Sequence, residues 1–94
     1  MEQGRRHRPV SERMTSAARA ILPGGVDSNV RLDGAPIFFA RGEGAWLWDV
    51  DGHDYVDYLL GQGPAFLGHA PAAVVEAVNE AVRNGMVYGA QHPL

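Results

Sequence analysis

The 94-residue sequence contains no cysteine and no lysine. The lack of cysteine excludes disulfides, thiolate metal sites and a cysteine nucleophile. Because all eight basic residues are arginine, no residue of this sequence can form a Schiff base or act as a lysine general base. These two absences limit the chemistry that the sequence can perform by itself.

Long apolar runs are also missing, as is the apolar core of a signal peptide, so we expect a cytoplasmic protein without a membrane partner. The net charge is −3, although arginines gather near the N-terminus. Residues 1–10 are predicted to form a flexible basic tail, because no aromatic residues are interleaved with the arginines as in a nucleic-acid-binding arm. No nucleic-acid partner is therefore expected. Residues 11–94 are predicted to form one segment, small enough to be a single domain or a piece of a larger one.

Two amphipathic helices are predicted. Ser11 is suited to cap a helix over residues 11–22, and the Pro-Gly-Gly sequence at 23–25 is expected to end it. A second helix is predicted over residues 71–84, with Gly85 as its C-terminal cap. The side of the second helix that we expect to be buried comprises Val74, Val75, Val78, Ala81 and Val82.

Three strands are predicted between the helices. The first covers residues 36–41 and is followed by a turn at residues 42–44. Residues 45–58 alternate in polarity on both sides of Asp51-Gly52, which predicts a hairpin closed by a type I′ turn. The predicted fold class is α+β: a helix, a three-stranded antiparallel meander and a second helix, with the first helix covering one face of the sheet.

Several aspartates of the hairpin could suggest a metal site. Relative to Asp49, however, the glycine of a calcium-binding loop is misplaced, and Leu60 stands where the glutamate ligand belongs. We therefore predict turn-forming, solvent-facing aspartates and no metal. After the hairpin, residues 59–68 are rich in glycine but too apolar for a linker, which indicates backbone that passes close to another group. His69 follows them and is predicted to form a structural hydrogen bond into this turn.

Ser28 and Arg31 lie three residues apart in a loop without helical or strand periodicity. An arginine held there could present its planar guanidinium to a carboxylate, and the serine hydroxyl could add a further hydrogen bond. An ion pair between Arg31 and either Asp27 or Asp33 explains the same residues equally well. Spacing alone does not separate these two interpretations.

Three motifs resemble those of one enzyme family. Pro23-Gly-Gly-Val-Asp-Ser-Asn-Val-Arg31 is similar to the Pro-Gly-Gly-Val-Asn-Ser-Pro-Val-Arg signature of the glutamate-1-semialdehyde 2,1-aminomutases. The hairpin sequence from Trp48 to Tyr58 resembles a motif of the wider class III aminotransferases, and Gly63-Pro-Ala-Phe-Leu-Gly-His69 resembles a third motif. The resemblance covers about residues 11–90, with the motifs in the family order.

This resemblance implies the N-terminal part of a fold type I transferase that depends on pyridoxal 5′-phosphate and forms a homodimer. Its substrate would be an amino acid or amino-aldehyde, and Ser28 and Arg31 would contact the substrate carboxylate. The family's Schiff-base lysine would lie beyond this sequence, so we expect a truncated and inactive fragment. No catalytic residue is assigned within it.

Two positions depart from the family pattern. Asn29 replaces a proline of the loop, and Gln62 replaces a tryptophan beside the substrate, so that Gln62 would shape the substrate pocket. The connection over residues 32–35 is also shorter than is typical. These departures leave open a class III transaminase acting on another amino acid or amine. A non-catalytic, truncated dimerisation module is a further alternative.

Overall fold

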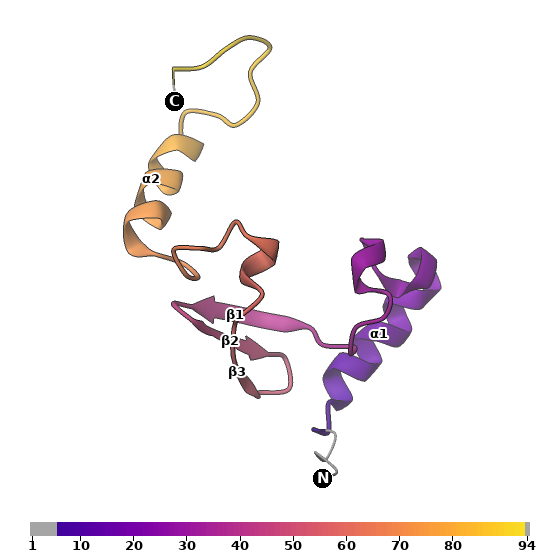
Figure 1. The fold of residues 1–94 in the computed structure, drawn as a ribbon. Helices are drawn as coiled ribbons and strands as arrows, with labels where there is room; N and C mark the ends of the chain where they lie inside the picture. The colour runs from indigo at the N-terminus through magenta and orange to yellow at the C-terminus, as the bar shows by residue number, and fades with distance from the viewer. Residues whose placement is uncertain (1–5, 94) are drawn as a thin grey trace.

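The computed structural model describes residues 6–93. Two α-helices flank a three-stranded sheet, and Figure 1 shows the elements α1 Pro9–Ile21, β1 Phe39–Glu43, β2 Trp46–Asp49, β3 Asp54–Val56 and α2 Ala72–Val82. Short 3-10 turns lie at Pro23–Gly25, Asn29–Arg31 and Leu60–Gln62. The predicted α+β class and the order helix, meander, helix are confirmed.

The sheet is antiparallel, with the strands in the order β1-β2-β3. Gly42 pairs with Leu47 and Glu43 with Trp46, so β1 continues through two residues that we expected to lie in a turn. The turn is restricted to Gly44-Ala45, where Gly44 has a φ of 56°. The prediction of a turn over residues 42–44 is therefore wrong, because backbone pairing extends to the last residue before this tight turn.

The predicted hairpin is confirmed, but its type I′ turn is not. A type I′ turn needs positive φ at both central residues, and of Asp51 and Gly52 only Gly52 has a positive φ, of 87°. Asp49 N–H donates to the carbonyl of His53 at 2.9 Å, which leaves a three-residue loop between them. This loop is longer than predicted because the Asp49 carboxylate accepts hydrogen bonds from the backbone N–H groups of Asp51 and His53.

Helix α1 begins at Pro9, two residues earlier than predicted, and Ser11 is not its N-cap. Ser11 is completely buried in the first turn, and its Oγ accepts a hydrogen bond from Phe38 N–H at 3.4 Å. The prediction was wrong because the N–H groups of this helix end are satisfied from outside the helix. As predicted, the helix ends at the Pro-Gly-Gly sequence, where Gly24 and Gly25 have φ values of 69° and 74°.

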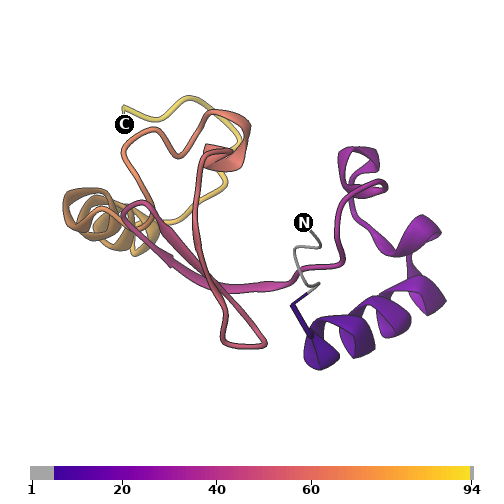
Figure 2. The same ribbon diagram turned by 60° about the horizontal axis from the view of Figure 1, so that its bottom comes forward.

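The two helices lie at opposite ends of the sheet in both views of the ribbon (Figures 1 and 2). Helix α1 contacts the hairpin through the backbone N–H groups of its first turn. It does not pack over a face of the sheet, contrary to our expectation. The valines of α2 at positions 74, 75, 78 and 82, which we predicted to be buried, are between 43% and 52% exposed. An amphipathic pattern shows that a helix has an apolar side but does not show what covers it.

No apolar side chain is buried anywhere in residues 6–93. The radius of gyration is 17.0 Å, whereas a compact domain of this length would have a radius of about 12 Å. The buried side chains are polar: Ser11 is 0% exposed and Asp49 is 3% exposed. The described arrangement is consequently held by strand pairing and by hydrogen bonds to carboxylates, rather than by an apolar core.

Candidate functional site

Asp49, at the end of β2, is the centre of a buried polar cluster. Its Oδ2 accepts hydrogen bonds from the Tyr55 hydroxyl at 2.8 Å and pairs with His53 Nδ1 at 2.9 Å. Its Oδ1 accepts the backbone N–H groups of Asp51 at 3.0 Å and His53 at 2.8 Å. Arg8 Nε lies 3.8 Å from Oδ2 and also donates to the Tyr55 hydroxyl. We predicted a solvent-facing Asp49, and this prediction is wrong. The register of the strands surrounds its carboxylate with the donors of the turn and of β3.

These contacts keep Asp49 ionised. Burial raises the pKa of its carboxyl. Hydrogen bonds from His53 and Tyr55 and the charge of His53 lower this pKa by more than burial raises it, so that the net pKa is well below the ordinary value. A carboxyl with such a low pKa carries no proton near neutral pH and is a poor general base. We therefore interpret the Asp49 cluster as structural.

Asp51 joins the hairpin to helix α1. Its Oδ1 and Oδ2 accept the backbone N–H groups of Val10 at 2.7 Å and Ser11 at 2.9 Å, which would otherwise have no partner within the helix. Burial raises the pKa of Asp51, but its hydrogen bonds from Ser11 and Val10 outweigh that effect and lower the pKa overall. A carboxylate at a helix N-terminus is also favoured by the helix dipole.

Arg6 and Arg8 contact the same hairpin. Arg6 donates to the carbonyl of Asp54 at 3.0 Å, and its guanidinium lies 5.1 Å from the centre of the Tyr55 ring. The predicted flexible tail covers residues 1–10, of which residues 1–5 lie outside the described residues. Within the described part of that range, Arg6, Arg8 and Val10 contact the hairpin.

The pH dependence of stability follows from these carboxyls. The pKa values of Asp49, Asp51 and Asp57 are all lowered from the ordinary value of 3.8. Each group therefore stabilises the folded state above pH 3.8, and this contribution is lost as the pH falls through the lower folded pKa. We expect the urea midpoint of unfolding to fall when the pH is lowered from about 5 to about 3. An Asp49→Asn variant should lose less stability over the same range, and equal losses in both proteins would contradict this assignment.

The structure places Ser28 and Arg31 in one turn. Ser28 precedes the 3-10 turn Asn29–Arg31, and its carbonyl accepts the Arg31 backbone N–H at 3.0 Å. The Arg31 guanidinium forms an ion pair with the carboxylate of Asp27. Both partners are exposed, with side-chain exposures of 61% and 76%. Of the two interpretations left open by the sequence, the ion pair is present here, but an exposed pair of this kind contributes only about 0–1 kcal/mol.

Gln62 lies in a left-handed turn that the sequence did not indicate. Leu60, Gly61, Gln62 and Gly63 have φ values of 55°, 61°, 65° and 121°. Left-handed backbone costs a non-glycine residue about 1–2 kcal/mol, so Leu60 and Gln62 adopt it against their local preference. Strained backbone of this kind persists where surrounding contacts fix it, and it occurs often at ligand-binding segments.

Asp57 and His69 hold the two ends of this segment. His69 Nε2 lies 2.6 Å from Asp57 Oδ2, which confirms the predicted structural hydrogen bond of His69. This hydrogen bond is the largest cause that lowers the pKa of Asp57, followed by the Leu60 backbone N–H, while burial raises it. The sequence pointed to His69 but not to its partner twelve residues earlier.

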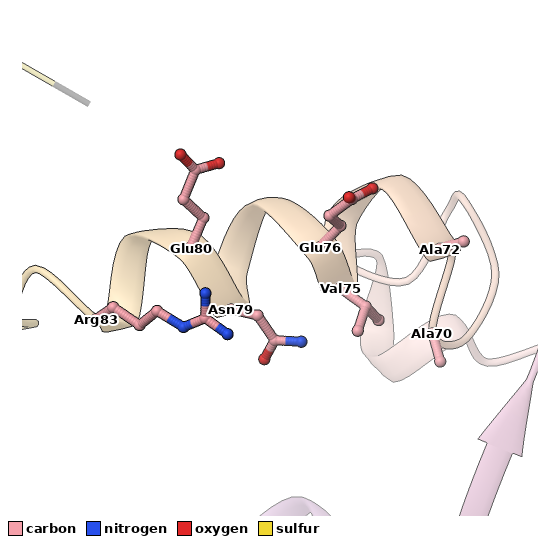
Figure 3. Close-up of a pocket in the computed structure, with 7 residues that line it drawn as sticks. All are labelled: Ala70, Ala72, Val75, Glu76, Asn79, Glu80 and Arg83. Carbon is pink, nitrogen blue, oxygen red and sulfur yellow. The ribbon is translucent and has the colours of Figure 1, made fainter.

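The turn at Asn29–Arg31 and the turn at Leu60–Gln62 lie well apart in both views of the ribbon and do not pack together (Figures 1 and 2). The structure thus unites Ser28 with Arg31 but leaves Gln62 apart from them. An open hollow lies along α2, as Figure 3 shows, and is lined by Ala70, Ala72, Val75, Glu76, Asn79, Glu80 and Arg83. It contains none of the predicted site residues.

Within residues 6–93, no helix has the length and apolar character needed to cross a membrane.

A family model and the similar curated proteins indicate the same family. Residues 28–92 match the family model described as aminotransferase class-III. A glutamate-1-semialdehyde 2,1-aminomutase of Chloroflexus aurantiacus is 53% identical over 79 residues, which cover 80% of this chain and 18% of that protein. The chain thus spans about a fifth of the length of the curated relatives it matches.

Solved structures that resemble this chain also include aminotransferases. A β-phenylalanine aminotransferase of Variovorax paradoxus superposes with a TM-score of 0.81 and 34% identity, over 92% of this chain and 20% of that one. A transaminase solved with PLP bound superposes with a TM-score of 0.79 and 32% identity, over 88% of this chain and 20% of that one. The helices and the meander described above therefore have the arrangement found in transaminase structures.

Proposed function

Because this chain belongs to the class III aminotransferases, we propose that it forms the N-terminal segment of a pyridoxal phosphate-dependent enzyme that moves an amino group. The observation that carries the proposal is the turn that holds Ser28 and an exposed Arg31 together, within a Pro-Gly-Gly-Val-Asp-Ser-Asn-Val-Arg sequence. The identity of 53% to an aminomutase favours a glutamate-1-semialdehyde 2,1-aminomutase-like reaction. We further expect the complete enzyme to be a homodimer.

In this proposal Arg31 binds the carboxylate of an amino acid or amino-aldehyde substrate. The guanidinium can donate two parallel hydrogen bonds to a carboxylate. Ser28 lies in the same turn, and in this proposal its hydroxyl adds a third. In the structure the Arg31 guanidinium is paired with the carboxylate of Asp27. This ion pair is exposed and weak, so a substrate carboxylate can take the place of Asp27. Gln62 would contribute to the wall of the pocket from the left-handed turn.

The residues of this chain do not suit covalent attachment of the cofactor. The chain has no lysine for a Schiff base, and neither of its short glycine pairs forms a phosphate-binding turn between a strand and a helix. Pyridoxal phosphate would have to be held by residues outside this chain, and we assign no step through it. We accordingly propose that these 94 residues are inactive by themselves.

Replacement of Arg31 by alanine tests the proposal. A hydrogen-bonded contact to a charged group contributes about 1.5–3 kcal/mol, so we expect the KM for glutamate 1-semialdehyde to rise by about 10- to 100-fold in the full-length enzyme. The kcat should change less, because Arg31 does not touch the reacting amino group. The matched control is Asp27→Asn, which removes the ion-pair partner but leaves the guanidinium, and whose KM should not rise. An unchanged KM in Arg31→Ala would refute the assigned role.

A second candidate function is a class III transaminase that uses another amino acid or amine. It is favoured by Gln62, where an amide replaces the aromatic wall expected for aminomutases, and by the likeness to a β-phenylalanine aminotransferase. Turnover of glutamate 1-semialdehyde without an external amino acceptor would favour the aminomutase. Activity that requires a second amino or keto substrate would favour the transaminase.

A further inference from the structure

The glycine-rich segment leaves the sheet and returns to it at almost the same place. At its start, Asp57 N–H donates to the carbonyl of Ala45 at 2.8 Å. At its end, His69 exchanges two backbone hydrogen bonds with Gly44, at 2.9 and 2.8 Å. Both ends are therefore attached to the Gly44-Ala45 turn, and residues 58–68 form a loop that is closed at its neck.

A side-chain pair closes the same neck, and we call Asp57 and His69 the neck clamp. Asp57 Oδ1 accepts the backbone N–H groups of Leu59 at 2.8 Å and Leu60 at 3.0 Å. Asp57 Oδ2 is the atom that meets His69 Nε2, and the two side chains are 5% and 23% exposed. One carboxylate thus holds both the first residues of the loop and the residue that ends it.

The clamp is attached where the left-handed turn begins. Leu60, which donates to Asp57, is the first of four successive residues with positive φ. The turn has its own hydrogen bonds, from Gln62 N–H to Leu59 and from Gly63 N–H to Leu60, each at 3.0 Å. These local bonds are available to many turns and do not select left-handed backbone at Leu60 and Gln62, so an outside constraint is needed.

We propose that the neck clamp is a positioning device: it keeps the Leu60–Gly63 turn left-handed and thereby fixes the orientation of Gln62. Neither clamp residue touches substrate, and both act through the turn. Control of the turn, the first part of this proposal, follows from the hydrogen bonds of Asp57 and His69 given above. The second part, an effect on substrate choice, rests on the role of Gln62 in the proposed function.

Hydrogen exchange tests the first part in the intact enzyme. His69→Ala should raise the exchange rates of the backbone amides of residues 60–63 by about 10-fold or more, because a charge-assisted hydrogen bond at the neck is lost. His69→Gln keeps a donor at the position of Nε2 and should restore most of the protection. A variant that only weakened the whole fold would raise exchange throughout the sheet as well.

A second variant disturbs the clamp without removing either member. A Cβ added at Gly42 would lie 2.6 Å from His69 Cγ and 2.9 Å from His69 Cβ, so Gly42→Ala must displace the ring. It should raise exchange in residues 60–63 as His69→Ala does. The control is Gly89→Ala, the same substitution at a position where an added Cβ has no neighbour within 4 Å. Unchanged exchange in both His69→Ala and Gly42→Ala would overturn the proposal.

Kinetics test the second part. His69→Ala and Gln62→Ala should shift the ratio of kcat/KM between two amino substrates in the same direction, mainly through KM, and His69→Gln should restore the original ratio. A shift in Gln62→Ala without one in His69→Ala would overturn the positioning role. A third outcome is faster exchange in the clamp variants while the ratio of kcat/KM changes in no variant, Gln62→Ala included. This outcome would support control of the turn by the clamp and refute the proposed role of Gln62.

Discussion

Replacement of Asp49 by alanine is expected to lower the free energy of unfolding by about 3–5 kcal/mol, the cost of removing one member of a buried charged network. The substitution leaves the Tyr55 hydroxyl, the His53 ring and two backbone N–H groups without their acceptor at once. Because no apolar side chain of residues 6–93 is buried, no neighbouring core compensates for the loss. Thermal unfolding of the intact protein measures it.

The matched control is Asp54→Ala in the same hairpin. Asp54 is exposed and holds Arg6 through its backbone carbonyl, which the substitution retains, so the change should stay within about 0.5 kcal/mol. Asp49→Asn should fall between the two, since its amide oxygen can still accept the backbone N–H groups of Asp51 and His53. If Asp49→Ala proved as mild as Asp54→Ala, the cluster would not be a major source of stability.

The hairpin illustrates what the sequence could and could not predict. Alternation around Asp51-Gly52 is a local property, and it correctly predicted two paired strands. The burial of Asp49 depends on partners in other elements, because Arg8 comes from the helix end and Tyr55 from the facing strand. An aspartate beside a turn looks solvent-facing until the register of the strands is known. The same carboxylate also changes the loop from the predicted type I′ turn to three residues.

The candidate site shows the same division. Ser28 and Arg31 were singled out as candidates because they lie in one short motif. The structure places them in one turn, and their role in binding stays a prediction. Their position relative to Gln62 could not be predicted, because it depends on where the chain places the two turns relative to the sheet. The left-handed backbone at Leu60 and Gln62 also gave no signal, because neither residue prefers it. The helices kept their predicted boundaries to within two residues, but the partners of their apolar sides are not fixed by periodicity.

Substitution of Gly25 by alanine should have the second largest effect on stability and should also weaken substrate binding. Gly25 is buried and has a φ of 74°, and an added Cβ would lie 2.6 Å from Arg19 Cγ and 3.3 Å from Arg19 N. Left-handed backbone costs about 1–2 kcal/mol, and overlap in a packed position costs about 1–3 kcal/mol, so we expect a loss of about 2–5 kcal/mol in stability. Displacement of the turn should also raise KM if Ser28 and Arg31, which lie three and six residues after Gly25, bind the substrate carboxylate as we propose.

Gly24→Ala separates the two causes of this loss. Gly24 has a similar φ of 69°, but its added Cβ would overlap only with the end of the exposed Leu32 side chain, at 2.5 Å, which can move away. It should therefore show the backbone cost with little of the overlap. Removal of the Arg19 side chain in an Arg19→Ala/Gly25→Ala double variant should recover part of the stability, since the Cγ contact disappears while the backbone contact at 3.3 Å stays. Equal losses in Gly24→Ala and Gly25→Ala, without recovery in the double variant, would show that backbone conformation alone makes glycine necessary between α1 and the Ser28–Arg31 turn.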